Sequence, residues 1–351
     1  MEETINAPEL IDLLICPGFC VENSKVIQVN DAARRSFLEV GTDLDSILVT
    51  GQEEYRHFHE GCLYLTVCLS GEVQGATVIR VGKTDVFLLD EQTELRELQV
   101  LALAAQELRL PLSNVILSAD QLSQSQDSAE NQQSAARLSR GTAQLQRLIS
   151  NMSDALRYMK GGQLQLRNIT SLLREQFEKA QVLSQDSGVA LSYEGPQEDI
   201  FTLLDSEQLE RAVYNLLSNA LKFTPRGGQI SAQLKRSGKL LQLTIQDSGS
   251  GIADGILGSI FTRYLRQPSL EDSRFGLGLG MVLIRAAART HGGTVLIDRP
   301  SEGARISMTL SIRESPETML RSPVLTVDYA GERDHGLLEL SESLPAALYL
   351  S

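Results

Sequence analysis

Residues 215–225 read Asn-Leu-Leu-Ser-Asn-Ala-Leu-Lys-Phe-Thr-Pro and close a helical pattern that begins at Ser206. Asn215 and Asn219 are one turn apart, so they share one face of this helix. An amide oxygen in that position can ligate Mg²⁺, and Lys222 just beyond can meet phosphate oxygens. Taken alone, the stretch is as typical of an ordinary helix with a polar face as it is of a site for Mg²⁺ and phosphate. The neighbouring blocks decide between these two interpretations.

A turn with two glycines follows the predicted strand Leu240 to Gln246. It begins at Asp247 and contains Gly249 and Gly251. A carboxylate at the end of a strand can accept a hydrogen bond from the exocyclic amino group of adenine. Glycines let the backbone approach the base because they lack a Cβ atom. Alone, this DxGxG pattern indicates only a turn.

Two further blocks lie between residues 260 and 284. Residues 260–266, IFTRYLR, offer Phe261 as an apolar anchor and Arg266 as a basic side chain. The polar segment that follows, residues 267–274, has the right length for a mobile lid. Glycines then alternate with leucines at the start of a predicted helix, where free backbone N–H groups can cradle phosphates. These glycines are Gly276, Gly278 and Gly280.

Together the four blocks resemble the N, G1, F and G2 boxes of the GHKL ATPases, and in particular the catalytic domain of sensor histidine kinases. The resemblance spans residues 163–314 in the family's order and spacing. It implies an α/β sandwich of the Bergerat type that binds ATP with Mg²⁺. The metal contact that it implies is Asn219, through the bound ATP, with Asn215 as a second candidate. The nucleotide-binding residues that it implies are Asn215, Asn219, Lys222, Asp247, Gly249, Gly251, Phe261, Arg266, Gly276, Gly278 and Gly280.

Upstream, residues 93–162 follow a repeat of three and four residues that predicts a helical hairpin. Apolar residues from Leu98 to Leu122, and again from Leu138 to Met159, form a heptad-like seam on either side of a polar turn. Two antiparallel helices bury only half a core, so the seam predicts a homodimer that closes a four-helix bundle. The pair Gly161-Gly162 ends the second helix and acts as a hinge.

Residues 104–112, AAQELRLPL, resemble the H box of the family's dimerisation and phosphoacceptor hairpin. Gln106 stands where the family has the phosphoacceptor histidine. Imidazole accepts a phosphoryl group through a nitrogen lone pair, whereas the lone pair of a glutamine amide is delocalised into its carbonyl. Leu110 stands where the family has a polar residue that orients water. Glu107, the general base that the resemblance implies, and Pro111, at the helix kink, are retained.

The two ends of the chain carry weaker patterns. Residues 1–90 alternate strand-like runs with turns, and one helix is expected from Asn30 to Leu38, capped by Asn30 or Asp31. The hairpin and helix start in residues 19–37 resemble the opening of a PAS sensor domain, which implies an α/β sensor. Residues 315–351 contain a strand-like run and a short apolar helix, Gly336 to Leu350, and indicate no role. The whole is predicted to be a multidomain α+β chain.

The charge and hydropathy of the chain restrict its partners. The 351 residues hold 32 Lys and Arg against 45 Asp and Glu, a net charge of −13. That charge repels polyphosphate backbones and no basic patch is segregated, so we expect no nucleic acid partner. The longest apolar runs fall far short of the roughly 20 residues that cross a bilayer. The acidic N-terminus, Met1-Glu2-Glu3, differs from a secretory signal, so a cytoplasmic location is expected.

The combined pattern favours a histidine-kinase-like signalling protein that binds Mg·ATP and cannot phosphorylate itself at Gln106. Its expected partners are a second copy of the chain and a response regulator or another histidine kinase. Two alternatives stay open. One is an active GHKL kinase that phosphorylates serine, threonine or another residue of a partner. The other is a non-catalytic scaffold or ligand sensor.

Overall fold

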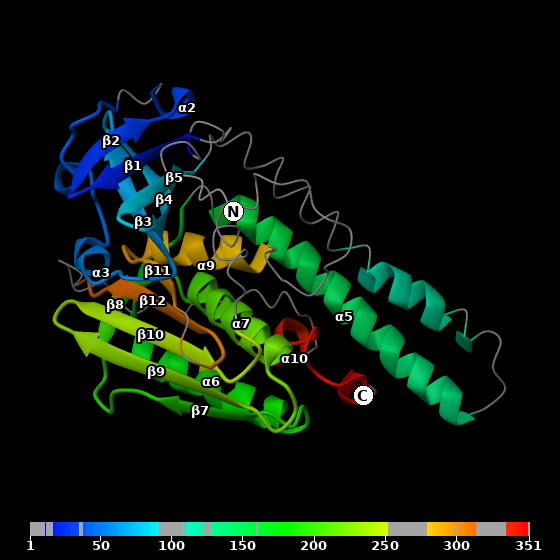
Figure 1. Ribbon diagram of the computed structural model, residues 1–351. Helices are drawn as coiled ribbons and strands as arrows, with labels where there is room; N and C mark the ends of the chain where they lie inside the picture. The colour runs from blue at the N-terminus through cyan, green and yellow to red at the C-terminus, as the bar shows by residue number, and fades with distance from the viewer. Residues whose placement is uncertain are drawn as a thin grey trace.

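The computed structural model describes residues 11, 17–34, 38–90, 108, 110–119, 121–122, 128–158, 161–251, 279–298, 300, 302–313 and 335–349. Within these residues, one mixed sheet of ten strands has the order β2-β1-β5-β4-β3-β11-β12-β10-β9-β7. Helices α6, α7 and α9 pack against its C-terminal half, and a helical arm extends away from the sheet (Figure 1).

The N-terminal half of the sheet is antiparallel. Its elements are β1 (Gly18–Glu22), β2 (Lys25–Val29), α2 (Asp31–Arg34), η1 (Leu44–Ser46), α3 (Gln52–Arg56), β3 (Cys62–Leu69), β4 (Glu72–Val81) and β5 (Thr84–Leu89). The strands fall on the predicted strand-like runs, which confirms them. Helix α2 begins after Asn30, whose side chain accepts a hydrogen bond from the Ala33 N–H at 2.9 Å and so caps the helix. These elements enclose their own core around Phe19, Phe58 and Phe87.

The C-terminal half mixes helices and strands, as expected for the α/β sandwich that the resemblance implies. Its elements are α6 (Ile169–Gln185), β7 (Ala190–Glu194), α7 (Ser206–Phe223), β9 (Gln229–Ser237), β10 (Leu240–Asp247), α9 (Leu279–Thr290), β11 (Val295–Asp298) and β12 (Arg305–Ser311). Asn168 and Asp205 cap α6 and α7 by accepting backbone N–H groups of the first turn. A two-stranded sheet of β6 (Gln165–Asn168) and β8 (Phe201–Leu204) was not predicted, because four residues are too few for an alternating pattern to stand out.

The two halves of the sheet meet where β3 pairs with β11. Tyr64 lies opposite Val295 and Cys62 opposite Ile297 in antiparallel register. Beside this junction the hydroxyl groups of Thr294 and Thr309 donate to Oε1 of Glu54, at 3.2 and 3.0 Å. No sequence pattern predicted this pairing, because strand alternation says which face is buried but not which edge is joined.

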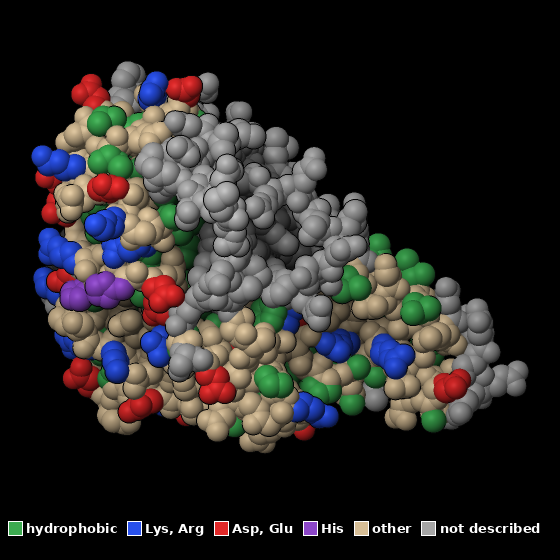
Figure 2. All heavy atoms as spheres, viewed as in Figure 1, with side chains coloured by type: hydrophobic (Ala, Val, Ile, Leu, Met, Phe, Trp, Pro, Cys, Tyr) green, Lys and Arg blue, Asp and Glu red, His purple; other side chains and the backbone are tan. Residues whose placement is uncertain are grey.

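The helical arm consists of residues 110–119 and α5 (Ser128–Tyr158). The two helices touch at Gly141, where an added Cβ would lie 2.6 Å from the Val115 side chain. Hydrophobic side chains are exposed along this arm (Figure 2). Those of largest exposure are Leu110, Leu112, Ile116, Leu117 and Ile149. Among the described helices, none is both long and apolar enough to traverse a bilayer.

Residues 335–349 return to the middle of the molecule, beside α5 and the end of α7 (Figure 1). They form α10 (His335–Glu339) and η3 (Ala346–Tyr349). The predicted single helix from Gly336 to Leu350 is therefore wrong. Pro345 interrupts it, because proline cannot continue the hydrogen bonding of a helix. We call residues 335–349 the C-terminal segment.

Candidate functional site

Helix α7 carries the asparagines that the sequence singled out. Asn215 is 2% exposed, and its Nδ2 donates to the Arg211 carbonyl at 2.8 Å. Its Oδ1 accepts a hydrogen bond from Nη2 of Arg147 at 3.0 Å. Asn219 is partly buried one turn later, and Lys222 follows in the last turn of the helix. The predicted arrangement of two amides and one ammonium along α7 is thus present.

Asp247 ends β10, and its carboxylate is held firmly in place. It is 8% exposed, and its Oδ1 accepts the backbone N–H groups of Gly249 at 2.9 Å and Ala304 at 3.3 Å. Burial raises the pKa of the carboxyl above its ordinary value, and these backbone donors offset part of that rise. The carboxylate therefore keeps one orientation at the end of the strand, as an acceptor for an amino group requires.

Two glycines allow close approaches at the site. An added Cβ at Gly280 would lie 2.7 Å from Oδ1 of Asn215, so only glycine lets α9 begin against the α7 amide. Gly303 has a φ of +72°, and its Cβ would lie 1.7 Å from the carbonyl oxygen of Asp247. Sequence reasoning missed Gly303, although a glycine between the strands β11 and β12 was a signal for a special turn. The Gly249 and Gly251 turn lies beside it, since a Gly251 Cβ would be 3.1 Å from the Gly303 carbonyl oxygen.

Several predicted site residues lie outside the described residues. They are Gln106, Glu107, Phe261, Arg266, Gly276 and Gly278. The described residues therefore bring together the N-box amides, the Asp247 turn and Gly280.

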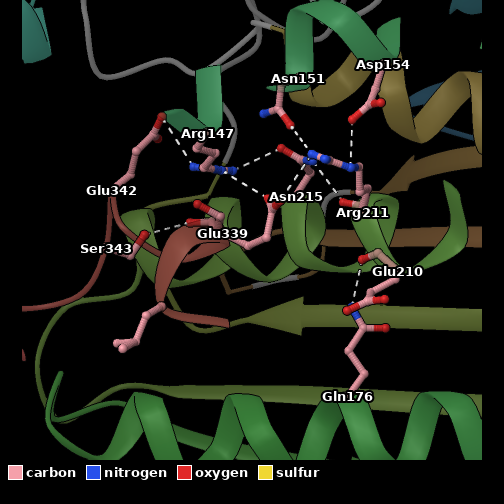
Figure 3. A network of polar contacts seen from close by, with 12 residues as sticks. Arg147, Asn151, Asp154, Gln176, Glu210, Arg211, Asn215, Glu339, Glu342 and Ser343 are labelled. Atoms are coloured by element: carbon pink, nitrogen blue, oxygen red, sulfur yellow. Dashed lines mark hydrogen bonds and ion pairs between the residues drawn. The ribbon is translucent and has the colours of Figure 1, made fainter. Parts of the chain in front are cut away.

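A buried polar network that sequence reasoning missed lies on α5 and α7 (Figure 3). Arg211 of α7 pairs through Nε with Oδ2 of Asp154 at 2.7 Å, and its Nη1 lies 3.5 Å from Oδ1 of Asn151. Arg147 reaches Asn215 from the same helix as Asp154. The spacing of Arg147, Asn151 and Asp154 at four and three residues was the available signal, because it places three polar side chains on one helical face.

The C-terminal segment completes this network with two carboxylates. Glu339 is 0% exposed and contacts both arginines, at 3.4 Å from Nε of Arg147 and 3.3 Å from Nη1 of Arg211. Glu342 lies 3.4 Å from Nη1 of Arg147 and 3.6 Å from Nζ of Lys222. Its pKa is lowered, because the attraction of Arg147, Lys222 and Arg140 outweighs the opposing effect of burial. A predicted phosphate-binding lysine is thus paired with a carboxylate of the same chain.

The carboxyl of Asp154 behaves in the opposite way. Burial raises its pKa to about 6, and the attraction of Arg211 and Arg157 only partly compensates. Asp154 therefore titrates close to neutral pH, whereas Glu342 stays ionised there.

The residues present fit a magnesium nucleotide. Oxygen ligands from Asn215 and Asn219 suit Mg²⁺, and Lys222 suits a phosphate. The carboxylate of Asp247 suits an exocyclic amino group, and Gly280 leaves room beside the amide. One contact departs from what this ligand needs, because Oδ1 of Asn215 faces the cationic side chain of Arg147.

Comparison with known proteins agrees with this geometry. Residues 204–314 match the family described as histidine kinase-, DNA gyrase B- and HSP90-like ATPases. The chain is 30% identical over 243 residues to the adaptive-response sensory kinase SasA of Crocosphaera subtropica, covering 66% of this chain and 63% of that protein. It is 30% identical over 214 residues to the sensor histidine kinase CusS of Escherichia coli K12, covering 59% of this chain and 44% of that protein.

Among solved structures, the chain matches the histidine kinase ThkA in complex with the response regulator TrrA. The two chains are 15% identical, with a TM-score of 0.46, and the match covers 86% of this chain and 97% of that one. The chain spans less than two thirds of the length of the curated relatives named above.

Proposed function

Because the chain belongs to the sensor histidine kinase family, we propose that it binds Mg·ATP and acts in two-component signalling without phosphorylating itself at the usual position. Residues 163–314 would hold the nucleotide. Residues 93–162 would form the dimerisation hairpin, and residues 1–90 a PAS-like sensor. The nucleotide would then serve as a ligand that changes the conformation of the hairpin.

The observation that carries this proposal is the meeting of three boxes at α7. Asn215 lies against Gly280 at the start of α9, and the turn after Asp247 approaches the end of the same helix. Asp247 would accept the adenine amino group, and Lys222 would contact phosphate. Asn219, and Asn215 when it is released from Arg147, would hold Mg²⁺. When bound, the magnesium nucleotide supplies a phosphoryl group activated by the metal for transfer.

The chemistry of residue 106 argues against transfer to the usual position. A glutamine amide has no nucleophilic nitrogen lone pair, so it cannot replace imidazole as acceptor. Leu110 argues in the same way against the phosphatase reaction, in which the family's polar residue at this position orients a water molecule. Its side chain is exposed and aliphatic, so it cannot orient a water molecule by hydrogen bonding.

Exposed apolar residues of the arm support a dimer. Leu112, Ile116 and Leu117 on the first helix are 48–58% exposed, and Ile149 on α5 is 54% exposed. A second copy of the arm would cover these side chains in a four-helix bundle. The family's activity also makes a response regulator, or another histidine kinase, the partner class that we propose.

Nucleotide binding is the first test. Isothermal titration of the purified chain with ATP and Mg²⁺ should show binding that Asp247→Asn weakens by about 1–3 kcal/mol, because the substitution spoils one charge-assisted hydrogen bond in a buried site. An affinity that is unchanged in Asp247→Asn would remove this residue from the site. Absence of binding in every protein would favour the scaffold alternative.

Labelling with radioactive ATP tests the acceptor. The wild-type chain should incorporate no acid-labile phosphate, and Gln106→His should gain base-stable, acid-labile label on residue 106. Even a 1 Å misplacement of the nucleotide can lower the rate by about a hundredfold. A low level of label on residue 106 therefore suffices to show that Gln106→His accepts the phosphoryl group. Acid-stable label on serine or threonine of a partner would instead favour the alternative kinase.

A further inference from the structure

The C-terminal segment is fastened to both α5 and α7. Arg140 of α5 donates to the carbonyl oxygens of Ser341 and Glu342, at 2.9 and 2.7 Å. On the other side, Oγ of Ser343 donates to the Ser218 carbonyl of α7 at 3.1 Å. Leu338, Leu340 and Leu344 are almost fully buried and belong to the same core as α6 and α7. The segment therefore has a defined docking place.

A carboxylate of the C-terminal segment contacts Lys222, the side chain that we expect to bind a phosphate group. Glu342 lies 3.6 Å from Nζ of Lys222, the lysine that ends the N box. The pKa of Glu342 is lowered, so this carboxylate is ionised at neutral pH. A triphosphate at Lys222 would have to displace Glu342, because two anions cannot share one ammonium without repulsion.

Docking also engages the predicted metal ligand. Glu339 and Glu342 both hold the guanidinium of Arg147, which in turn donates to Oδ1 of Asn215 at 3.0 Å (Figure 3). A divalent cation on the same oxygen would lie against a positive charge. Metal binding at Asn215 therefore requires Arg147 to move. The carboxylates of Glu339 and Glu342 in the C-terminal segment hold Arg147 where it is.

We propose that the C-terminal segment is a built-in competitor of the nucleotide, with Glu342 at the lysine that phosphate would use and Glu339 anchoring Arg147 on Asn215. This inference rests on the proposed nucleotide site and adds its regulation. The docked segment also bridges the hairpin helix α5 and α7, so its release removes one set of contacts between the ATP domain and the arm. Nucleotide and docked segment exclude one another, and each weakens the binding of the other.

The size of the effect follows from the docked fraction. The apparent dissociation constant for nucleotide equals the intrinsic constant divided by the fraction of molecules with the segment released, so a segment docked in about 99 of 100 molecules weakens binding about a hundredfold. Variants that weaken docking should therefore bind nucleotide more tightly than the wild type.

Two variants with opposite charge changes separate competition from simple electrostatics. Glu342→Gln removes a negative charge and the contact with Lys222, whereas Leu344→Asp adds a negative charge but places it in a buried position of the segment. Competition predicts tighter Mg·ATP binding in both, by about threefold to tenfold for Glu342→Gln and tenfold or more for Leu344→Asp. Electrostatics alone predicts weaker binding in Leu344→Asp. Glu198→Gln, in an exposed ion pair with Arg236 on the ATP domain, is the matched control and should bind as the wild type does.

Hydrogen exchange of the intact wild-type chain supplies an independent readout. The N–H groups of Leu340 and Leu344 donate within the docked segment, so saturating Mg·ATP should speed their exchange. Equal nucleotide affinity in all four proteins, or unchanged exchange at saturation, overturns the competition and leaves the nucleotide site standing. If none of the proteins binds nucleotide, including Leu344→Asp, the proposed function itself is overturned and the competition with it.

Discussion

The two faces of α5 differ in what they bury. One face carries the predicted apolar seam, yet Ile149 remains 54% exposed and its neighbours Leu145 and Met152 are only partly buried. The other face carries Arg147 and Asp154, which are 4% and 6% exposed. Within the described residues, the apolar face of this helix is thus open at Ile149, whereas the charged face is closed. Hydrophobicity alone would have assigned them the other way round.

The two faces of α5 differ in exposure because different parts of the molecule supply the side chains that cover them. Charged side chains are buried only when oppositely charged groups meet them, and the partners of Arg147 and Asp154 are supplied by α7 and the C-terminal segment. Along the apolar seam, Met152 and Leu156 pack against α9, but Ile149 stays exposed among the described residues, so its partner is expected from a second copy of the chain.

The largest expected effect comes from breaking the closed face. Glu339→Gln leaves Arg147 and Arg211 buried with less compensating charge, which should lower the free energy of unfolding by about 3–5 kcal/mol. Urea denaturation followed by circular dichroism measures it. The same substitution in the exposed pair, Glu198→Gln, should change stability by about 1 kcal/mol or less. Equal losses in the two variants would contradict the distinction between the faces.

A change of pH tests the closed face of α5 through Asp154, with a smaller expected effect on the free energy of unfolding. The pKa of Asp154 is raised to about 6 from an ordinary value of 3.8, so the folded chain binds this proton more tightly than the unfolded chain. Its contribution to stability is present at low pH and is lost as the pH rises through about 6. The stability of the wild type relative to Asp154→Asn should therefore fall between pH 4.5 and pH 7.5, by at most about 3 kcal/mol. A relative stability that rises over this range would show that the ion pair with Arg211 outweighs burial.

The smallest effect is expected on the open face. Ile149→Glu should leave the fold of each protomer intact, because the side chain is exposed, but should weaken the proposed dimer about tenfold, or about 1.4 kcal/mol. Sedimentation equilibrium reports the dissociation constant. Val182→Glu, at a 66% exposed position of α6, is the control and should leave it unchanged. A wild-type chain that is monomeric at micromolar concentration would refute the dimer.

Local patterns were sufficient for the elements and for part of the site. The cap of α2 by Asn30 and the start of α9 at Leu279 were predictable from sequence. Both depend on residues that lie within a few positions of the helix start. Asn215, Lys222 and Asp247 were identified by family motifs that are contiguous in sequence. By contrast, the contacts of Glu339 and Glu342 join residues more than a hundred positions apart, and no local propensity records such a pairing.

The pairing of β3 with β11 has a consequence for the synthesis of the chain. Roughly 230 residues separate the two strands, which at about 5–20 residues per second corresponds to about 12 to 46 seconds of translation. Once β5 has been made, the N-terminal sheet still lacks the partner of residues 62–64 of β3, because among the described residues only 66–68 of that edge pair within the N-terminal half. An unpaired edge of this kind is a place where nascent chains can associate wrongly, so a holding chaperone on the ribosome would be most useful to this protein between the emergence of β5 and that of β11.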